Sequence, residues 1–286
     1  MLNELVNVEK VEGLRFISLC SDTTFKYLYK NEKTRKWFNY LIKEKFNLDL
    51  SDYILVDNEL NTGNDIKDYR LDLKLEKENS IIILEMNQTY YNFLDNKNYQ
   101  YLYRIAGSRF DTGEEYVNKP TKLILFNYFR NKKIPEMKLA NYVLEEVETK
   151  LRINDIESYE IYLPNYSKVC YDSSEVDISL SLFSCNSYES MRNKTNNPKD
   201  IEIIEELEKL AMNEKFIYEY DREAVKRKTE NSIRNEGRIE GRMEGKIEGI
   251  SESKIEIAKA MLKDNVDIDT VSKYTNLTVK EIEELL

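Results

Sequence analysis

The sequence predicts an α/β domain with a mixed sheet, followed by a long helical C-terminal tail. Up to Tyr128, apolar segments typical of buried strands alternate with segments whose apolar residues have helical spacing. Two of the strand-like segments are joined by a short polar stretch, which indicates an antiparallel hairpin within the sheet. From Pro198 the sequence becomes highly charged and strongly helical. These observations favour a sheet covered by helices, with a separate tail.

The N-terminal region is expected to be helical over residues 11–48, with large apolar residues along one stripe. Ser21 or Asp22 is a natural N-cap for the helix that follows. Residues 53–60 alternate as a strand does, and residues 61–65 have the composition of a turn.

Two further strands, 69–75 and 81–87, form the predicted hairpin. The second begins with four consecutive aliphatic residues, as expected of a strand buried on both faces, and turns polar at Glu85. Residues 93–110 are typical of a tyrosine-rich helix, and residues 122–128 are typical of another buried strand.

Residues 158–163 favour one more strand, and the region after it up to Tyr188 has no clear pattern. We therefore divide the chain into three parts. They are a core domain over 1–197, a helical linker over 198–250 and a small helical unit over 251–286.

Within the linker, glycine recurs at every fourth residue from Gly237 to Gly249. A glycine stripe lets a second helix approach closely, which predicts self-association, although this packing is best attested in membranes. A charged, partly frayed spacer held by Glu–Arg and Glu–Lys pairs is the alternative. A nucleic-acid-binding arm fits less well, because glutamates balance the basic residues.

The last part contains helical pieces at 255–263, 268–274 and 279–286, which outline a helix-turn-helix-like unit. Thr278 is placed to cap the last piece. Only two cations, Lys273 and Lys280, lie in the last two pieces among several acids, so a protein contact is a better prediction than DNA binding.

Composition excludes several classes of site. The chain has no histidine, which removes His-based general bases, Ser-His-Asp triads, HNH sites and zincins. The 3 cysteines are widely spaced, without a CxxC pair, which indicates free thiols in a reducing cytosol. Neither a secretory leader nor a membrane-spanning run is recognisable, so a cytoplasmic protein without a membrane segment is expected. The net charge of −10 argues against general DNA coating but not against a nuclease with an acidic metal pocket.

Two acids at the edge of the predicted hairpin are the candidate site. Alternation places Arg70, Asp72 and Lys74 on one face of the first strand, and Glu85 and Asn87 on one face of the second. The acids are 85 − 72 = 13 residues apart, which suits a hairpin that brings both carboxylates together. Such oxygen ligands favour Mg²⁺ or Mn²⁺, which polarises a phosphoryl oxygen and activates water. Two solvated strand-end acids are the alternative interpretation of the same spacing.

Four segments in order, with the EGRxEGR repeat of the tail, resemble the Rpn family of recombination-promoting nucleases, also called PD-(D/E)XK nuclease family transposases. The segments are SDTTFKYLY (21–29), YRLDLKL (69–75), IIILEMNQ (81–88) and KNYQYLYRI…GEEY (97–116). The likeness covers most of residues 20–130 and 230–286. It implies a restriction-endonuclease-like PD-(D/E)XK core and DNA cleavage linked to recombination or mobile elements.

By this resemblance, Asp72 is the family's strand aspartate and Glu85 is the glutamate of its E-x-Q element, and both would bind Mg²⁺ or Mn²⁺. Asn87 stands where the family usually has Gln and where wider PD-(D/E)XK enzymes have Lys. Asn has no charge to steady a developing phosphorane. Lys74, on the predicted face of Asp72, is the candidate substitute, and a solvated strand lysine is the alternative.

Further residues match the family in two helices. Asp22 and Lys26 fall in its opening D-x-x-F-K element and are possible accessory residues, with Asp22 either a third ligand through water or a helix cap. Lys97, Tyr101 and Arg104 lie on one helix face and match basic and aromatic positions. They are candidate DNA-backbone contacts, and a solvated helix face is the alternative.

The sequence thus predicts a cytoplasmic, Mg²⁺-dependent deoxyribonuclease that binds DNA and forms a homo-oligomer through its tail. The rival is a catalytically degenerate, DNA-binding or scaffold protein that has kept the nuclease fold, and Asn87 is its main support. An RNA target is a third possibility.

Overall fold

The computed structural model describes residues 13–56, 59–60, 69–78, 80–91, 93–107, 120–168 and 172–286. The chain divides into two compact units, Met1–Glu223 and Ala224–Leu286. The turn predicted at 61–65, the end of the helix predicted at 93–110 and Cys170 lie outside the described residues. Cys20 is buried and Cys185 half-buried, and both are free thiols.

The first unit is built on a six-stranded mixed sheet in the order β1-β4-β5-β6-β8-β7. Strands β5, β6 and β8 are parallel, whereas β1, β4 and β7 are antiparallel to their neighbours. The prediction of an α/β fold with a mixed sheet is confirmed. The strands are β1 (Ile54–Val56), β4 (Leu73–Lys77), β5 (Ser80–Asn87), β6 (Thr121–Asn127), β7 (Leu139–Glu145) and β8 (Arg152–Tyr162), with a separate short pair, β2 (Glu59–Leu60) and β3 (Tyr69–Arg70).

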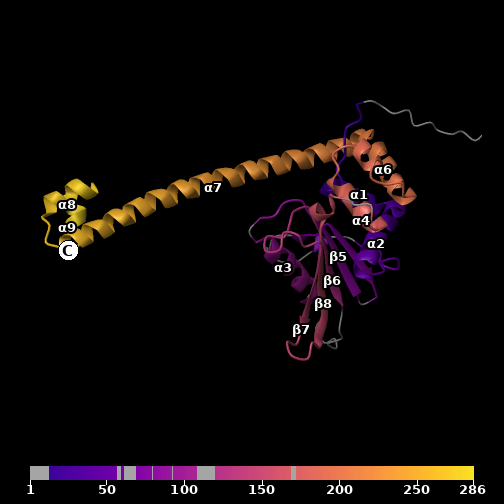
Figure 1. The fold of residues 1–286 in the computed structure, drawn as a ribbon, viewed down its shortest axis with the longest axis horizontal. Coiled ribbons are helices and arrows are strands. Elements are labelled where there is room, and N and C mark those ends of the chain that lie inside the picture. Colours follow the sequence, from indigo (N-terminus) through magenta and orange to yellow (C-terminus); the bar gives the residue numbers. More distant parts are fainter. Residues whose placement is uncertain are drawn as a thin grey trace, which may run out of the picture. The chain divides into compact units, whose positions relative to one another are not determined.

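Helices cover both faces of this sheet (Figure 1). On one face, the larger core cluster joins the sheet to the helices α1, α2, α4 and α6, and on the other a smaller cluster packs against α3. The helices of this unit are α1 (Asp22–Lys30), α2 (Glu32–Phe46), α3 (Leu94–Gly107), α4 (Glu175–Ser181), α5 (Tyr188–Arg192) and α6 (Pro198–Ala211), with 3₁₀ turns η1 (Leu163–Tyr166) and η2 (Leu182–Ser184).

Strand β5 is buried on both faces, as its aliphatic run predicts. Ile82 and Leu84 belong to the larger cluster, and Ile81 and Ile83 belong to the smaller one. Because its side chains anchor both helical layers, β5 holds its polar end, from Glu85 on, in a fixed position between them.

The helical structure expected over 11–48 is confirmed for most of Asp22–Phe46 and wrong for the residues before it. Residues 14–20 are not helical, and the rest forms two helices that meet at Asn31. The Asn31 side chain accepts a hydrogen bond from the Lys33 backbone at 3.0 Å and so starts α2, while Ser21 caps α1. A side chain that caps a new helix competes with continuation of the previous one.

The strand expected over 69–75 is interrupted at Asp72. Leu71 packs in the smaller cluster, whereas Leu73 and Leu75 pack in the larger one on the opposite face. Strict alternation therefore fails at Asp72, and the prediction that Asp72 and Lys74 lie on one face of a continuous strand is wrong. The side chain of Arg70, the third residue of that prediction, lies outside the described residues.

Two features near the C-terminal side of the sheet differ from the prediction. Strand β8 is longer than 158–163, and β7 was not predicted, because its residues are only half-buried or exposed and leave no apolar run. The hairpin between β4 and β5 is present as predicted, with Lys77 opposite Ser80.

Helix α6 belongs to the first compact unit, whereas the sequence predicts a linker over 198–250. Ile203, Ile204 and Leu207 are buried in the larger cluster. The Asp200 carboxylate, 0% exposed, accepts hydrogen bonds from Trp37 Nε1 and Ser179 Oγ, both at 2.7 Å. A buried carboxylate must be satisfied in this way, and its donors tie α6 to α2 and α4.

The second unit begins within α7 (Glu214–Lys263) and continues with α8 (Ile268–Thr275) and α9 (Val279–Glu283). Residues 255–263 are helical as predicted and the helix ends at Lys263, but they form the end of α7 and not a separate helix. Thr278 caps α9 through a capping box with Glu281, as predicted. Ala258, Val271 and Ile282 form a small core for this unit.

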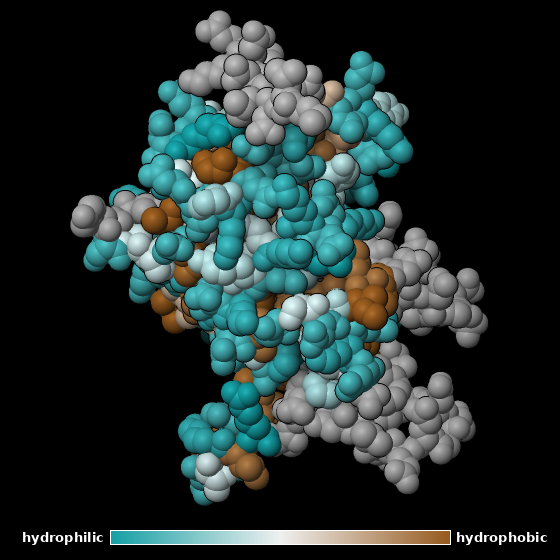
Figure 2. Space-filling view, turned by 90° about the vertical axis from the view of Figure 1, so that its right-hand side faces the viewer, coloured by the Kyte–Doolittle hydropathy of each residue, from teal (hydrophilic) through white to brown (hydrophobic). Residues whose placement is uncertain are grey.

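The face drawn in Figure 2 is mainly hydrophilic, and its hydrophobic residues gather in small separate patches. Within the part of the chain that the structure describes, no helix combines the length and the apolar character that crossing a bilayer requires.

Candidate functional site

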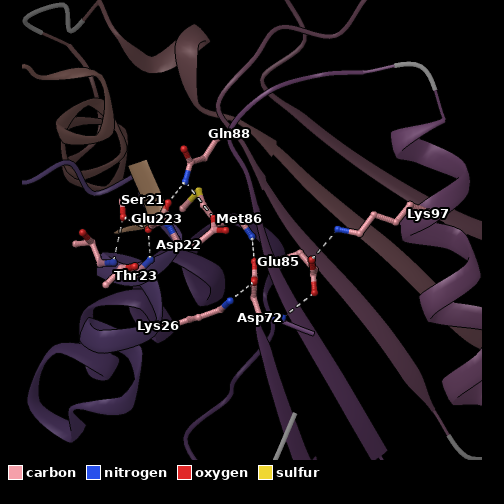
Figure 3. A network of polar contacts seen from close by, with 11 residues as sticks. Ser21, Asp22, Thr23, Lys26, Asp72, Glu85, Met86, Gln88, Lys97 and Glu223 are labelled. Carbon is pink, nitrogen blue, oxygen red and sulfur yellow. Dashed lines mark hydrogen bonds and ion pairs between the residues drawn. The ribbon is translucent and has the colours of Figure 1, made fainter. Parts of the chain in front are cut away.

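Asp72 and Glu85 lie opposite each other where the pairing of β4 with β5 ends. Leu73 pairs with Leu84, so the next step of the antiparallel register sets the two acids side by side. The Asp72 backbone N–H donates to Glu85 Oε1 at 2.9 Å, and the Met86 backbone N–H donates to Asp72 Oδ2 at 2.9 Å (Figure 3). Each carboxylate thus holds a backbone group of the other residue's strand, which fixes both carboxylates in place.

Two ammonium groups approach the acidic pair from opposite sides of the sheet (Figure 3). Lys26 on α1 lies with its Nζ 2.6 Å from Asp72 Oδ1. Lys97 on α3 lies with its Nζ 3.7 Å from Glu85 Oε2. The site therefore has two adjacent carboxylates between two cations, and each helical layer contributes one cation.

Both acids are buried, with 8% of Asp72 and 3% of Glu85 exposed. Burial, and then the nearby charge of Asp72, raise the pKa of Glu85 to about 8, against the opposing effect of Lys97. Burial lowers the pKa of Lys26, but the Asp72 carboxylate outweighs this, so the pKa of Lys26 is raised overall. A buried acid pair with this electrostatic cost is a feature of functional sites, because the cost is offset when a cation binds.

A second acidic cluster adjoins the pair at the start of α1. Glu223 accepts hydrogen bonds from Ser21 Oγ at 2.8 Å and from the Thr23 backbone at 2.9 Å. Gln88 Nε2 lies 3.1 Å from both Asp22 Oδ1 and Glu223 Oε1 (Figure 3). Burial, together with the charges of Asp72 and Glu223, raises the pKa of Asp22 to about 6.

Of the two predicted roles for Asp22, the helix cap is taken by the neighbouring Ser21. The Asp22 carboxylate is instead directed toward Gln88 and is close enough to Asp72 for their charges to interact. This position is compatible with an outer contact to a cation at the acidic pair.

Asn87 and Lys74 have partners of their own. Asn87 Nδ2 donates to Asn127 Oδ1 at 2.9 Å, and Lys74 Nζ lies 2.6 Å from Glu76 Oε1, further along β4. The cation that pairs with Asp72 is Lys26, which the resemblance implies only as a possible accessory residue.

The three predicted DNA contacts on α3 have different environments. Lys97 is partly exposed, pairs with Glu85 and lies 5.0 Å from the centre of the Tyr101 ring. Tyr101 is buried in the smaller core cluster, and Arg104 is half-buried. Lys97 belongs to the site, whereas Tyr101 chiefly supports it from the core.

Sequence reasoning missed Gln88, Glu223 and the polar group around Asn127. Asn127 could have been predicted from the sequence, because it ends β6 as Asn87 ends β5, and the two residues pair in register. Adjacent parallel strands end at the same edge of a sheet, so two terminal asparagines indicate a shared polar edge. Glu223 carries no such signal, since it lies in a helix remote from the site in sequence.

The donor atoms of the acidic pair suit a hard divalent cation, because carboxylate oxygens are the ligands that Mg²⁺ and Mn²⁺ prefer. Among the described residues, no group of three or more Asp, Glu or Cys side chains is arranged to hold a metal ion. Mg²⁺ is commonly bound by one or two protein carboxylates together with several waters.

Comparisons of the chain with protein-family models, curated proteins and solved structures find no match.

Proposed function

We propose that this chain is a Mg²⁺-dependent deoxyribonuclease of the PD-(D/E)XK kind. The observation that carries the proposal is the pair of buried carboxylates on adjoining strands, held by each other's backbone and placed between two ammonium groups. The resemblance to the Rpn family adds a link to DNA recombination or mobile elements, in the cytoplasm.

Asp72 and Glu85 would hold the cation, which supplies Lewis acidity toward a phosphoryl oxygen and lowers the pKa of a bound water. Lys26 and Lys97 balance the carboxylates and offer positive charge to a phosphate that enters the site. Asn87 holds the end of β5 against β6 through Asn127, which keeps Glu85 in register.

Nicking of supercoiled plasmid tests the proposal. We expect cleavage by the wild type with Mg²⁺ or Mn²⁺ and none with EDTA. Asp72→Asn and Glu85→Gln should each lower the cleavage rate by about 100-fold or more. Loss of a residue that only supports a metal ligand already costs up to about 100-fold, and these two residues would be ligands themselves. Glu76→Gln is the matched control, because Glu76 is an acid on β4 whose partner is Lys74.

Cutting that survives both substitutions would remove Asp72 and Glu85 from the chemistry. Single-stranded, duplex and RNA substrates run in parallel would identify the nucleic acid, and a preference for RNA would replace deoxyribonuclease by ribonuclease.

A non-catalytic nucleic-acid-binding or scaffold protein is the second candidate. It is favoured by Asn87, whose amide is engaged with Asn127 where PD-(D/E)XK enzymes have a lysine. Its signature is a wild type that binds DNA with Ca²⁺ yet cuts none with Mg²⁺ or Mn²⁺.

A further inference from the structure

A cavity of about 310 Å³ opens beside the acidic pair, at the carboxyl ends of β6 and β8. Its lining includes Asn127, the last residue of β6, and Tyr162, the last residue of β8. The N-terminal half of α3 contributes Asn98 and Tyr99. Ligands of sheets with parallel strands bind at this edge, and the volume is at the lower end of small-molecule sites.

The cavity contains an unsatisfied buried acceptor. Asn98 is 2% exposed, and none of the described residues donates a hydrogen bond to its Oδ1. A buried amide oxygen without a partner costs about 1–3 kcal/mol, so a native site that keeps one usually meets a donor from a ligand or a water. The Asn98 amide oxygen is therefore an acceptor that remains available for a hydrogen-bond donor.

Polar side chains at the end of the sheet form a continuous chain of hydrogen bonds. Asn127 Nδ2 donates to Glu160 Oε2 at 3.4 Å, and the Tyr162 hydroxyl donates to the same carboxylate. Asn131 Nδ2 in turn donates to the Tyr162 hydroxyl at 2.8 Å. Burial raises the pKa of Glu160, and the hydrogen bonds from Tyr162 and Asn127 oppose this rise. This edge of the sheet therefore offers several hydrogen-bonding groups.

Aromatic rings form the walls. Tyr90 and Phe129 meet at 5.4 Å between ring centres, and Phe129 contacts Tyr162 at 6.4 Å. Lys132 Nζ lies 3.9 Å from the centre of the Tyr90 ring at the exposed rim. Flat apolar walls, a polar floor and a cation at the mouth match a heteroaromatic ring that is attached to a phosphate.

The cavity and the acidic pair are both positioned by β5 and α3. Asn87, two residues after Glu85 on β5, donates to Asn127 in the cavity floor. Consecutive residues of α3 serve the two places, since Lys97 pairs with Glu85 and Asn98 lines the cavity. A strand of nucleic acid whose phosphate lies at the acidic pair would therefore have a neighbouring base within reach of the cavity.

We propose that this cavity binds one unstacked nucleobase of the nucleic-acid substrate, with the Asn98 amide oxygen accepting from the base. The inference rests on the proposed function for the identity of the substrate. A base outside a duplex stack is bound by aromatic side chains and by hydrogen bonds to its edge, which are the groups present here. The acceptor favours bases with an exocyclic amino group. Single-stranded or distorted substrates are therefore preferred over regular duplex.

Calorimetric titration of the full chain with deoxynucleoside 5′-monophosphates, in EDTA, tests the proposal. We expect saturable binding of dAMP, dCMP or dGMP, the nucleotides whose bases have an exocyclic amino group, that inorganic phosphate does not compete away. Phe129→Ala should weaken it about tenfold, the usual cost of losing one stacking partner. Tyr128→Ala is the matched control, because Tyr128 is the adjacent aromatic residue and is 39% exposed outside the cavity lining.

Asn98→Leu supplies a second variant, with circular dichroism as the check of folding. Affinity unchanged in both Phe129→Ala and Asn98→Leu, or no mononucleotide binding by the wild type, would overturn the proposal. Displacement of dAMP by equimolar inorganic phosphate would also overturn it, since the site would then recognise phosphate alone. Titration of Glu85→Gln separates this inference from the nuclease proposal, because base binding should persist when the acidic pair is disabled.

Discussion

Glu85 contributes both to the fold, by accepting a hydrogen bond from the Asp72 backbone, and to the proposed chemistry, as a metal ligand. It is buried next to Asp72, and its pKa is raised to about 8 by burial and by that neighbour. A carboxyl of this kind favours its protonated form in the apo protein. It becomes an effective metal ligand when a cation offsets the cost of ionisation.

The stability of the metal-free protein should consequently fall with pH. Between about 4.5 and about 8, the folded chain holds the Glu85 proton that the unfolded chain has already released. The free energy of unfolding should decline by about 1.4 kcal/mol for each pH unit within this window, the free-energy equivalent of one pKa unit. Urea unfolding of wild type and Glu85→Gln in EDTA measures this, and the variant should show a flatter profile.

Mg²⁺ should reverse this trend, because its ligands must be ionised and its binding strengthens as pH rises. Parallel pH profiles of wild type and Glu85→Gln, with and without Mg²⁺, would contradict the assigned role of Glu85.

Lys26 forms the ion pair with Asp72, the other carboxylate of the acidic pair. In Lys26→Met, the stem is kept but Asp72 loses its ammonium partner at 2.6 Å. We expect a loss of about 2 kcal/mol, below the value for a fully buried pair because Lys26 is partly exposed. Mg²⁺ should restore much of this loss by supplying the missing positive charge. Lys36→Met is the control, since Lys36 forms an exposed pair with Glu32 at 4.0 Å and should cost little.

At the scale of elements, the start of α1 depends on a residue of α7. Glu223 accepts from the backbone of Thr23 and from the Ser21 hydroxyl, and so places negative charge at the N-terminus of α1. Glu223→Ala should lower the free energy of unfolding by about 1–2 kcal/mol, as loss of a helix cap does. Glu219→Ala, an exposed residue one turn earlier, should change it little, and equal effects in urea unfolding would argue against this role.

The elements that could be predicted from sequence are those with a strong local pattern. β5 and β6 are buried on both faces and leave apolar runs, and the capping chemistry of Thr278 is visible in three residues. β7 escapes prediction because its side chains are not buried. The interruption at Asp72 escapes because it depends on which core cluster Leu71 joins.

The difference between local patterns and long-range packing also explains which contacts of the site could be predicted from sequence. Asp72 and Glu85 are neighbours through a hairpin, whose register follows from short-range sequence, so their meeting could be inferred. The contacts of Lys26 and Glu223 depend on how helices pack, which local patterns do not encode. Asn98 was passed over because a single asparagine in a helix has no distinguishing pattern.

For the whole molecule, the open question is what the second unit binds. Residues 228–253 of α7 are all exposed, including Ile239, Met243 and Ile247. Met243, Ile250 and Ile257 follow one another at heptad spacing, the pattern of a helix that pairs with another. A helix gains most of its stability in water by burying such a stripe, so we expect two copies of the chain to associate through it.

The glycine repeat offers a competing surface, and the two can be told apart. Gly241 and Gly245 are each two residues from Met243, which sets the glycines about 200° away from the apolar stripe. A Cβ at either glycine would meet nothing within 4 Å in the single chain. If the apolar stripe is the interface, Gly241→Ala should leave association intact and stabilise the helix by about 1 kcal/mol.

Sedimentation equilibrium of the full chain decides between these surfaces. Met243→Glu and Ile247→Glu should convert a dimer or larger assembly to a monomer, because each buries a charge in the apolar contact. Glu248→Gln, on the same exposed stretch, should leave the mass unchanged. Dissociation by Gly241→Ala and not by Met243→Glu would instead assign the interface to the glycine stripe. A wild type that stays monomeric at all concentrations would leave the charged spacer as the role of this helix.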